Sequence, residues 1–249
     1  GYRADFFGSE LITSLEILEA GHVRAKNMVG SWAGAMGLPQ FMPSSFMKYA
    51  VDFTGDGHKD IWGSVPDAQA SIANYLKSFG WRPGETWGYE VKLARDFNYQ
   101  NVWQGVTASL GDWRGVGVAR ANGKPFPRDS DTARLYMPMG GNGPVFAVLP
   151  NFGVIKRYNN SDSYALAVGH LADRIIGGKG FMTPWPNDTA LNADGRKQVQ
   201  ARLLKKGYAI GTPDGEIGPK TRAAVIDWQT RAGLLPDGHV SGNLLNALG

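Results

Sequence analysis

Hydrophobic positions recur at helical spacing in three long stretches of the chain. Residues 5–20, 67–79 and 162–176 each place apolar side chains three or four positions apart, and a glycine follows each stretch. This period buries one face of a helix, and a following glycine is a common C-terminal stop. We therefore predict three amphipathic helices, the second entered through Ser64 and the third capped by Ser161 or Asp162. The glutamates of the first helix, including Glu10, are expected to be ionised and solvated.

The middle of the chain has a different pattern. Short runs of alternating apolar and polar residues occupy 89–93, 116–119 and 145–149, and Gly, Pro, Asn and Asp separate them. Alternation with period two is typical of strands, so we predict a small β-rich insertion. Residues 181–189 contain two prolines and little periodicity, which indicates a linker or a docked strap.

Residues 190–249 contain a weak internal repeat. An apolar helix is followed by a D-G turn at Asp214, and a second helix is followed by another D-G turn at Asp237. In each turn the aspartate can bond the backbone and the glycine can take positive φ. We predict a small, separate helical module.

Composition narrows the classes of function. The 249 residues are 43% hydrophobic, carry a net charge of +4 and include no cysteine. A cysteine-free chain has no disulfides, no thiolate nucleophile and no cysteine-based zinc site. The basic residues are scattered and form no stripe, so nucleic acid is not an expected partner, and no apolar run reaches the ~20 residues of a membrane span. An anionic cell-wall polymer suits this charge equally well.

Residues 30–49, GSWAGAMGLPQFMPSSFMKY, are poor in charge and rich in glycine, methionine, proline and hydroxyl residues. Ser31 and Gln40 offer neutral hydrogen bonds beside apolar walls, which suits an uncharged, hydroxyl-rich ligand. The alternative is a buried loop that serves packing only. Ser44 or Ser45 is the expected N-cap of a short helix through 46–49.

An acidic loop follows at DFTGDGHKDIWGSVPD. Its first nine positions match those of a calcium-binding loop, with a glycine at the sixth, but Gly63 stands where the bidentate glutamate belongs. Asp67 is the most plausible later carboxylate, although its spacing from Ser64 also suits a helix cap. An ordinary Asx turn is the other alternative. The expected ligands are Asp52, Thr54, Asp56, His58, Asp60 and Asp67.

Three motifs occur together in order: A-G-A-M-G-x-x-Q-F-M-P-S-S at 33–45, the acidic loop, and A-N-Y at 73–75. In this combination the chain resembles the lytic murein transglycosylase B family. The resemblance implies an α+β, mainly α fold: a lysozyme-like catalytic core with a β-rich insertion and an EF-hand-like loop. It also implies structural Ca²⁺ and no organic cofactor. The implied substrate-binding residues are Ser31, Met36, Gln40, Tyr75, Tyr158, Asn159 and Tyr164. Packing in the core remains the alternative for each tyrosine.

The C-terminal stretch is similar to the small three-helix peptidoglycan-binding domain of cell-wall hydrolases. The matching D-G-x-x-G-P-x-T residues are Asp214, Gly215, Gly218 and Thr221. We predict four regions: the first segment of the catalytic core at 1–86, the insertion at 87–147, the second segment of the core with the linker at 148–189, and the peptidoglycan-binding domain at 190–249. The family also implies a bacterial periplasmic location and peptidoglycan strands as partner.

The expected reaction is cleavage of the MurNAc-GlcNAc β-1,4 bond with formation of a 1,6-anhydro product, which needs one carboxylic acid. The family's catalytic Glu sits in an E-[ST]-x-[FWY]-G motif, which does not occur in these 249 residues. We expect it upstream of Gly1, on the same polypeptide, and assign no catalytic residue within the chain. The chain alone is then expected to be inactive. The alternatives are a non-catalytic peptidoglycan-binding fragment or paralogue, and a calcium-sensing interaction protein.

Overall fold

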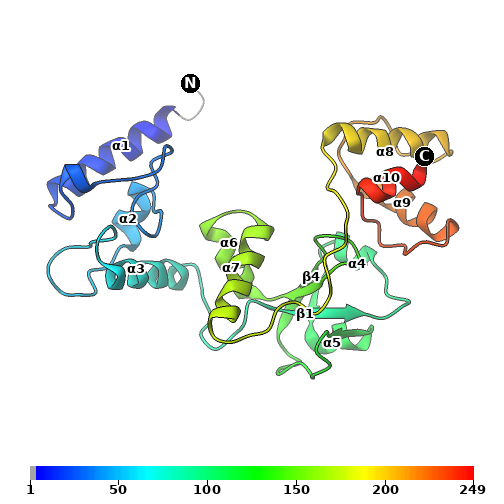
Figure 1. Ribbon diagram of the computed structural model, residues 1–249, viewed down its shortest axis with the longest axis horizontal. Helices are drawn as coiled ribbons and strands as arrows, with labels where there is room; N and C mark the ends of the chain where they lie inside the picture. Colours follow the sequence, from blue (N-terminus) through cyan, green and yellow to red (C-terminus); the bar gives the residue numbers. More distant parts are fainter. Residues whose placement is uncertain (1–3) are drawn as a thin grey trace. The chain divides into compact units, whose positions relative to one another are not determined.

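The computed structural model describes residues 4–249, which fall into two compact units, Gly1–Pro83 and Gly84–Gly249 (Figure 1). Each unit is described by itself. Across these residues every helix is too short or too polar to cross a membrane. The content is mainly helical with one small sheet, as the sequence predicts.

The first unit consists of short helices joined by long loops. Its elements are α1 (Ala4–Glu19), η1 (Ala25–Asn27), α2 (Pro43–Tyr49) and α3 (Val65–Ser78). The predicted first and second long helices are therefore present, with ends shifted by one or two residues. Ser64 is the N-cap of α3 and accepts a hydrogen bond from the Asp67 N–H, as expected.

Burial on α1 differs from the prediction. Leu11 is 62% exposed, whereas Glu10 is only 7% exposed. The expectation that Glu10 is solvated is therefore wrong, because its carboxylate bonds Ser44 at the start of α2. The expected Ser44 or Ser45 cap is also wrong: Met42 is the N-cap residue and makes no side-chain cap bond.

The second unit begins with a five-stranded antiparallel sheet of order β2-β4-β5-β1-β3. The predicted strands correspond to β1 (Gly88–Leu93), β3 (Val118–Arg120) and β5 (Val145–Val148). The sequence pattern missed the remaining elements of this region. These are α4 (Gln100–Trp103), β2 (Thr107–Ser109), α5 (Leu110–Gly115) and β4 (Thr132–Tyr136).

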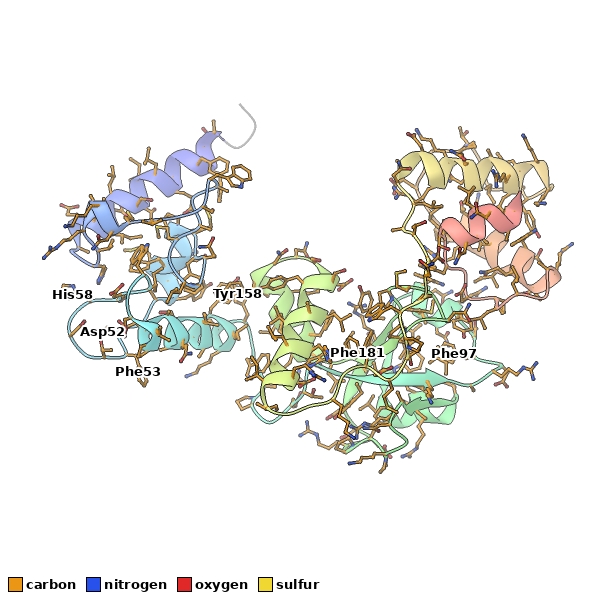
Figure 2. All side chains as sticks on the ribbon, viewed as in Figure 1. Asp52, Phe53, His58, Phe97, Tyr158 and Phe181 are labelled. Atoms are coloured by element: carbon orange, nitrogen blue, oxygen red, sulfur yellow. The ribbon has the colours of Figure 1, made fainter. Side chains whose placement is uncertain are left out.

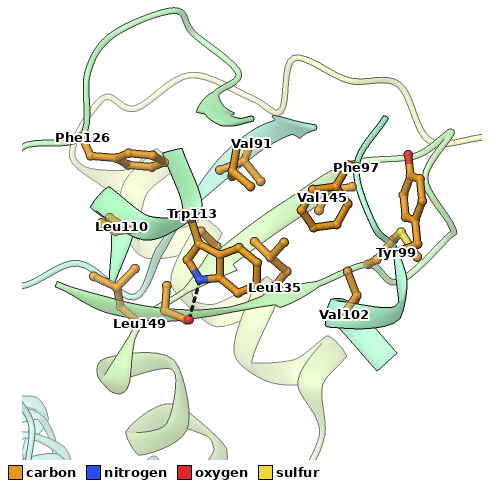
Figure 3. Packing of buried hydrophobic residues seen from close by; sticks show 14 residues of the cluster. Val91, Phe97, Tyr99, Val102, Leu110, Trp113, Phe126, Leu135, Val145 and Leu149 are labelled. Carbon is orange, nitrogen blue, oxygen red and sulfur yellow. Dashed lines mark hydrogen bonds between the residues drawn. The ribbon is translucent and has the colours of Figure 1, made fainter. Parts of the chain in front are cut away.

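The core of the insertion packs against one face of this sheet (Figure 3). Trp113 of α5 is buried there, and its indole N–H donates to the Ala133 carbonyl at 2.8 Å. Aromatic and aliphatic side chains from α4, α5 and four strands, β1, β3, β4 and β5, form this cluster with it. The insertion therefore has an apolar core of its own.

Two helices follow the sheet, α6 (Pro150–Tyr158) and α7 (Asp162–Ile175), and Ser161 caps the second as predicted. The segment after α7 is docked and not free, which selects the strap among the two predicted forms. The Glu90 carboxylate accepts hydrogen bonds from the Met182 and Thr183 N–H groups, both at 2.7 Å. Phe181 stacks on His170 with 3.8 Å between ring centroids.

The C-terminal residues form three helices around a small core, namely α8 (Ala193–Lys205), α9 (Pro219–Arg231) and α10 (Gly242–Leu248). A glutamine of α8, Gln200, holds the first D-G turn by two hydrogen bonds, an arrangement that we call a clasp. Gln200 donates to the Asp214 carboxylate at 2.9 Å and accepts from the Gly215 N–H at 2.7 Å. Gly215 has a φ of 84°, as the turn requires.

The second D-G turn repeats this arrangement on α9, which confirms the internal repeat. Gln229 donates to the Asp237 carboxylate and accepts from the Gly238 N–H, each at 2.8 Å. An arginine completes each clasp: Arg196 donates to the Gly215 carbonyl and Arg222 to the Gly238 carbonyl.

Only the second clasp, of these two, also contacts the β-rich insertion. The Asp237 carboxylate accepts from the Gly141 N–H at 2.8 Å, and the Asp237 carbonyl accepts from the Trp103 indole at 2.6 Å. The Arg222 guanidinium lies 3.7 Å from the centre of the Trp103 ring. Burial lowers the pKa of Arg222 to about 10, so it stays charged at neutral pH. One copy of the repeat thus holds the module against the insertion.

Candidate functional site

The glycine-rich stretch forms a tight loop that packs against the acidic loop. A Cβ at Gly37 would lie 2.6 Å from the Ile61 carbonyl oxygen, so only glycine fits this approach. Leu38 donates its N–H to the same carbonyl at 2.9 Å. Ser31 closes the loop, because its side-chain oxygen accepts from the Ala35 N–H at 3.1 Å.

Gln40 is the only non-glycine residue of the described chain with positive φ, at 54°. Its side-chain amide donates to the Gly37 carbonyl at 2.9 Å, and the residue is exposed. A left-handed conformation is costly for a residue with a Cβ and is often found at functional sites. The loop therefore holds the backbone of Gln40 in a strained conformation and leaves the residue exposed.

An open pocket of about 940 Å³ lies beside this loop. Ser31 and Gln40 line it together with Trp62, whose indole N–H donates to the Val29 carbonyl at 3.0 Å. Asp56 and Asp60 of the acidic loop line it as well. The structure thus brings some of the predicted substrate residues and some of the predicted metal ligands to one pocket.

The other two predicted substrate residues of this unit are core residues. Met36 is 4% exposed and Tyr75 is 9% exposed. Tyr75 packs among Tyr49 and Phe79, at centroid distances of 4.9 and 4.7 Å. Their burial agrees with the packing alternative.

The acidic loop connects α2 to α3, and Figure 2 shows Asp52 and His58 on it. Both Asp52 oxygens accept backbone N–H groups, from Gly55 at 2.6 Å and Gly57 at 2.9 Å. Asp60 accepts from the Trp62 and Gly63 N–H groups. The residue types suit Ca²⁺, which prefers carboxylate and carbonyl oxygens.

Asp67 organises the same loop from the start of α3. It is fully buried, and its two oxygens accept three backbone N–H groups, those of Phe53, Thr54 and Asp60, at 3.0 to 3.1 Å. Three acceptor positions of this carboxylate are therefore in use. Within residues 4–249 no three acidic or histidine side chains converge as metal ligands would. The predicted cation site is thus a set of suitable residues without ligand geometry.

His22 joins the acidic loop to the end of α1. Its Nδ1 accepts the Lys59 N–H at 3.3 Å, and its ring lies 5.5 Å from that of Phe46. Burial lowers the pKa of His22, and the charge of Lys59 lowers it further. The neutral ring is what an N–H acceptor requires.

The remaining predicted substrate residues lie in the second unit, where α6 meets α7. Tyr158 ends α6, Asn159 is its C-cap and Tyr164 lies in the first turn of α7. Tyr158 and Tyr164 are partly buried and Asn159 is exposed. Burial raises the pKa of Tyr164, so its hydroxyl remains a neutral hydrogen-bonding group. The prediction that these residues join Gln40 in one groove stays a prediction.

The predicted residues of the C-terminal module have structural roles in the first D-G turn and at the start of α9. Gly218 is the N-cap of α9, and Thr221 is buried in the same helix. The hydrogen bond from Gln200 lowers the pKa of Asp214, which keeps the clasp ionised at neutral pH. Glycan contact by these residues stays a prediction.

Sequence reasoning missed several residues that line the pockets. Arg24, Lys26 and Trp62 border the pocket at the glycine-rich loop. The two cations lie in a segment without periodicity, and Trp62 was passed over as a member of a cation loop. Only the fold places them beside Gln40.

Comparison with known proteins identifies the family. The transglycosylase SLT domain matches residues 1–173. The chain belongs to the transglycosylase SLT family. A peptidoglycan-binding domain matches residues 192–248 of this SLT-family chain. The resemblance seen in the sequence is thereby confirmed.

Individual relatives agree with this assignment. The chain is 35% identical over 173 residues to membrane-bound lytic murein transglycosylase B of Escherichia coli (strain K12), over 70% of this chain and 46% of that protein. It is similar to SltB3 of Pseudomonas aeruginosa, crystallised with NAG-anhNAM-pentapeptide, with a TM-score of 0.85 and 45% identity over 100% of this chain and 67% of that one.

A third relative bears on the acidic loop. The chain is similar to Escherichia coli lytic transglycosylase Slt35, whose structure was solved in complex with calcium. The TM-score is 0.57 at 35% identity, over 70% of this chain and 55% of that one. The SLT-family chain spans about half the length of the curated relative that it matches, 46%.

Proposed function

We propose that this chain is the groove-forming and glycan-binding portion of a lytic transglycosylase that cleaves the MurNAc-GlcNAc β-1,4 bond of peptidoglycan. The observation that carries the proposal is the pocket of about 940 Å³ lined by Ser31 and Gln40 of the signature loop. The neutral side chains of these two residues suit the hydroxyl and N-acetyl groups of a saccharide. Tyr158, Asn159 and Tyr164 of the second unit are also proposed as glycan contacts.

The proposed chemistry needs one carboxylic acid. This acid first protonates the leaving oxygen and then accepts a proton, while the 6-hydroxyl of the muramic residue closes on its own C1 to give the anhydro product. Within this chain the proposed residues bind and orient the sugar, and none is assigned as the acid. Glu10 is excluded from that role by its bonds to Ser44.

Two measurements on the purified chain test this function. In co-sedimentation with purified murein, we expect binding that Gln40→Ala weakens and Gln69→Ala, an exposed substitution on α3, does not. Mass spectrometry of the supernatant is expected to show no 1,6-anhydromuropeptides. Release of anhydro products would assign the acid to this chain, and absence of murein binding would refute the proposal.

The binding-only alternative predicts the same co-sedimentation result for this chain. It differs for the parent polypeptide, in which a transglycosylase carries an active acid and a binding protein does not. Assay of the full-length product for anhydromuropeptides therefore separates the two. A periplasmic location, which follows from the substrate, is tested by fractionation of the producing cells.

We also propose that the acidic loop binds structural Ca²⁺ through Asp52, Thr54, Asp56, Asp60 and the His58 carbonyl. Support comes from the oxygen-rich residue types and from the calcium complex of the relative Slt35. Asp67, whose oxygens already accept three N–H groups, positions the loop.

Thermal unfolding with calcium and with a chelator tests this cation proposal. We expect calcium to raise the melting temperature, because a ligand that binds only the native state stabilises it. Asp56→Asn should abolish this rise with little effect in chelator, whereas Asp67→Asn should destabilise the protein in both conditions. An unchanged melting temperature would refute the cation site, and exposure of apolar surface on binding would favour the sensor alternative.

A further inference from the structure

A second pocket, of about 630 Å³, lies in the unit Gly84–Gly249 between the sheet and α6. One wall is β4, which contributes Thr132 and Arg134, and the other is α6, which contributes Lys156 and Arg157. Nothing in the signature motifs marks these residues. Arg134 and Lys156 come together because both bond Asp162 at the start of α7, and Arg157 follows Lys156 in the chain.

Charge sets this pocket apart from the others. Arg134, Lys156 and Arg157 line it, and among the described residues no carboxylate does. Each of three other pockets has two carboxylates in its lining: Asp56 and Asp60, Glu90 and Asp173, and Asp188 and Asp237. The cations of this lining, with no carboxylate beside them in it, therefore favour an anionic ligand.

Two of the three cations, Arg134 and Lys156, are held in place by the fold. Asp162 accepts from Arg134 at 2.9 Å and from Lys156 at 2.8 Å, both through the same carboxylate oxygen. The Arg134 guanidinium also lies 5.6 Å from the centre of the Phe152 ring. Asp162 pairs with Arg134 and Lys156, and Arg157 is the third cation in the lining. Arg134 and Lys156 are partly buried, and cations fixed in this way bind a carboxylate more strongly than mobile surface lysines do.

The shape adds a second requirement. The floor is apolar, formed by Val148, Leu149, Pro150 and Phe152, while Thr107, Thr132 and Asn160 offer neutral hydrogen bonds at the rim. A lone inorganic anion would leave most of the volume unfilled. A short peptide with small side chains and a free carboxylate would match the floor, the rim and the charge.

The position connects this pocket to the glycan. Arg157 directly precedes Tyr158, and Asn160 directly follows Asn159, the two residues proposed to contact the sugar. A peptide attached to the lactyl group of a bound muramic residue extends from the sugar by its own length. A carboxylate pocket next to the sugar contacts is within that reach.

We propose that this pocket, defined by Arg134, Lys156 and Arg157, binds a free carboxylate of the peptidoglycan stem peptide. The inference rests on the proposed function and deepens it, because it makes the enzyme selective for strands that carry peptide stems. Arg134 and Asp162 position the site, and Lys156 and Arg157 meet the ligand.

Isothermal titration calorimetry with three probes tests the proposal on the intact chain. The probes are a GlcNAc-MurNAc disaccharide with its stem peptide, the same compound with the peptide carboxylates amidated, and a GlcNAc oligomer without any carboxylate. We expect amidation to weaken binding about ten-fold, the value of one charge-assisted hydrogen bond. The GlcNAc oligomer should bind through the sugar contacts alone.

The protein side of the test is the double variant Lys156→Gln with Arg157→Gln. It should lose about ten-fold in affinity for the free-carboxylate probe and nothing for the amidated probe or the GlcNAc oligomer. Arg114→Gln is the matched control. Arg114 lies on α5, forms an exposed ion pair with Asp129 and does not line this pocket. The control should bind all three probes as the unaltered chain does.

Two results would overturn the proposal. Equal affinity of the unaltered chain for free and amidated stems would do so without any variant, which covers the case in which the double variant fails to fold. If a folded double variant loses the same affinity for all three probes, the cations bind the sugar or maintain the fold and do not recognise the peptide carboxylate. A separate titration with the isolated stem peptide distinguishes failure of the two proposals. If no sugar probe binds and this peptide still does, the glycan assignment is refuted and the carboxylate pocket stands.

Discussion

The carboxylate of Glu10 accepts two hydrogen bonds from Ser44, from the hydroxyl at 2.6 Å and from the backbone N–H at 2.9 Å. Glu10 lies on α1, and Ser44 is the second residue of α2. Since Met42 provides no side-chain cap, Glu10 supplies the missing acceptor and places negative charge at the helix start. A carboxylate from one helix thus caps the next.

We expect Glu10→Ala to lower the free energy of unfolding of the first unit by about 2 kcal/mol, because two hydrogen bonds to a buried charge are lost. Glu10→Gln should cost less, since an amide oxygen still accepts one of them. Chemical denaturation measures both. Glu16→Ala, at an exposed position of the same helix, is the control and should change little. Equal effects at the two positions would contradict the capping role.

Gln40 links strain to binding. We expect Gln40→Gly to raise the stability of the first unit by about 1 kcal/mol, because glycine adopts positive φ without a Cβ penalty. The same variant should bind GlcNAc oligomers more weakly, since the pocket loses its amide. Thermal unfolding and calorimetry on one sample measure the two effects. Loss of stability together with unchanged affinity would show that Gln40 serves packing alone.

Trp103 fixes the C-terminal module to the insertion. Trp103→Phe keeps the ring under Arg222 but removes the indole N–H that donates to the Asp237 carbonyl. We expect a loss of about 1 kcal/mol in docking and faster proteolysis within residues 183–192. Trp185→Phe, a partly exposed tryptophan of the strap itself, is the control. Unchanged cleavage rates would mean that the contact does not hold the module.

His239 gives the C-terminal module a pH dependence. Burial lowers the pKa of His239, and the charge of Arg222 lowers it further. The carboxylates of Asp237 and Asp188 raise this pKa, but burial has the larger effect. The unfolded chain therefore takes up the proton first, near the ordinary value of about 6.5. Stability is complete above that pH and is lost as pH falls through it toward the lower folded pKa.

The measurement is amide hydrogen exchange of α9 and α10 at pH-corrected rates between about pH 7.5 and pH 5, the range that spans the ordinary histidine pKa. We expect protection to fall with pH in the unaltered chain. His239→Gln should flatten this slope, because glutamine has no proton to take up. A slope that survives the substitution would assign the pH effect to another group.

Local signals in the sequence were sufficient for much of the fold. The helix over 67–79, its Ser64 cap and the repeated D-G turns depend on contacts among residues close in the chain, and all three are present. The family signature was also legible, because it rests on a continuous run of residues. Short elements such as β2 and α4 were missed, since three or four residues carry too little periodicity to detect.

The candidate site was only partly predictable. Ser31 and Gln40 do line a pocket, but Tyr75 and Met36 are buried beneath it. Asp67 matched a ligand position by spacing, whereas in the fold its oxygens accept backbone N–H groups. A motif shows that a suitable residue type stands at a position, and it does not show which group that side chain bonds in the fold.

The sequence by itself determined the long helices, the D-G turns and the family, because these follow from neighbouring residues and from continuous motifs. Only the tertiary structure decided that Glu10 caps α2, that Asp237 and not Asp214 contacts the insertion, and that Arg134 meets Lys156 around Asp162. Such pairs are separated by many residues, so their meeting depends on how helices and strands pack and not on any periodicity along the chain.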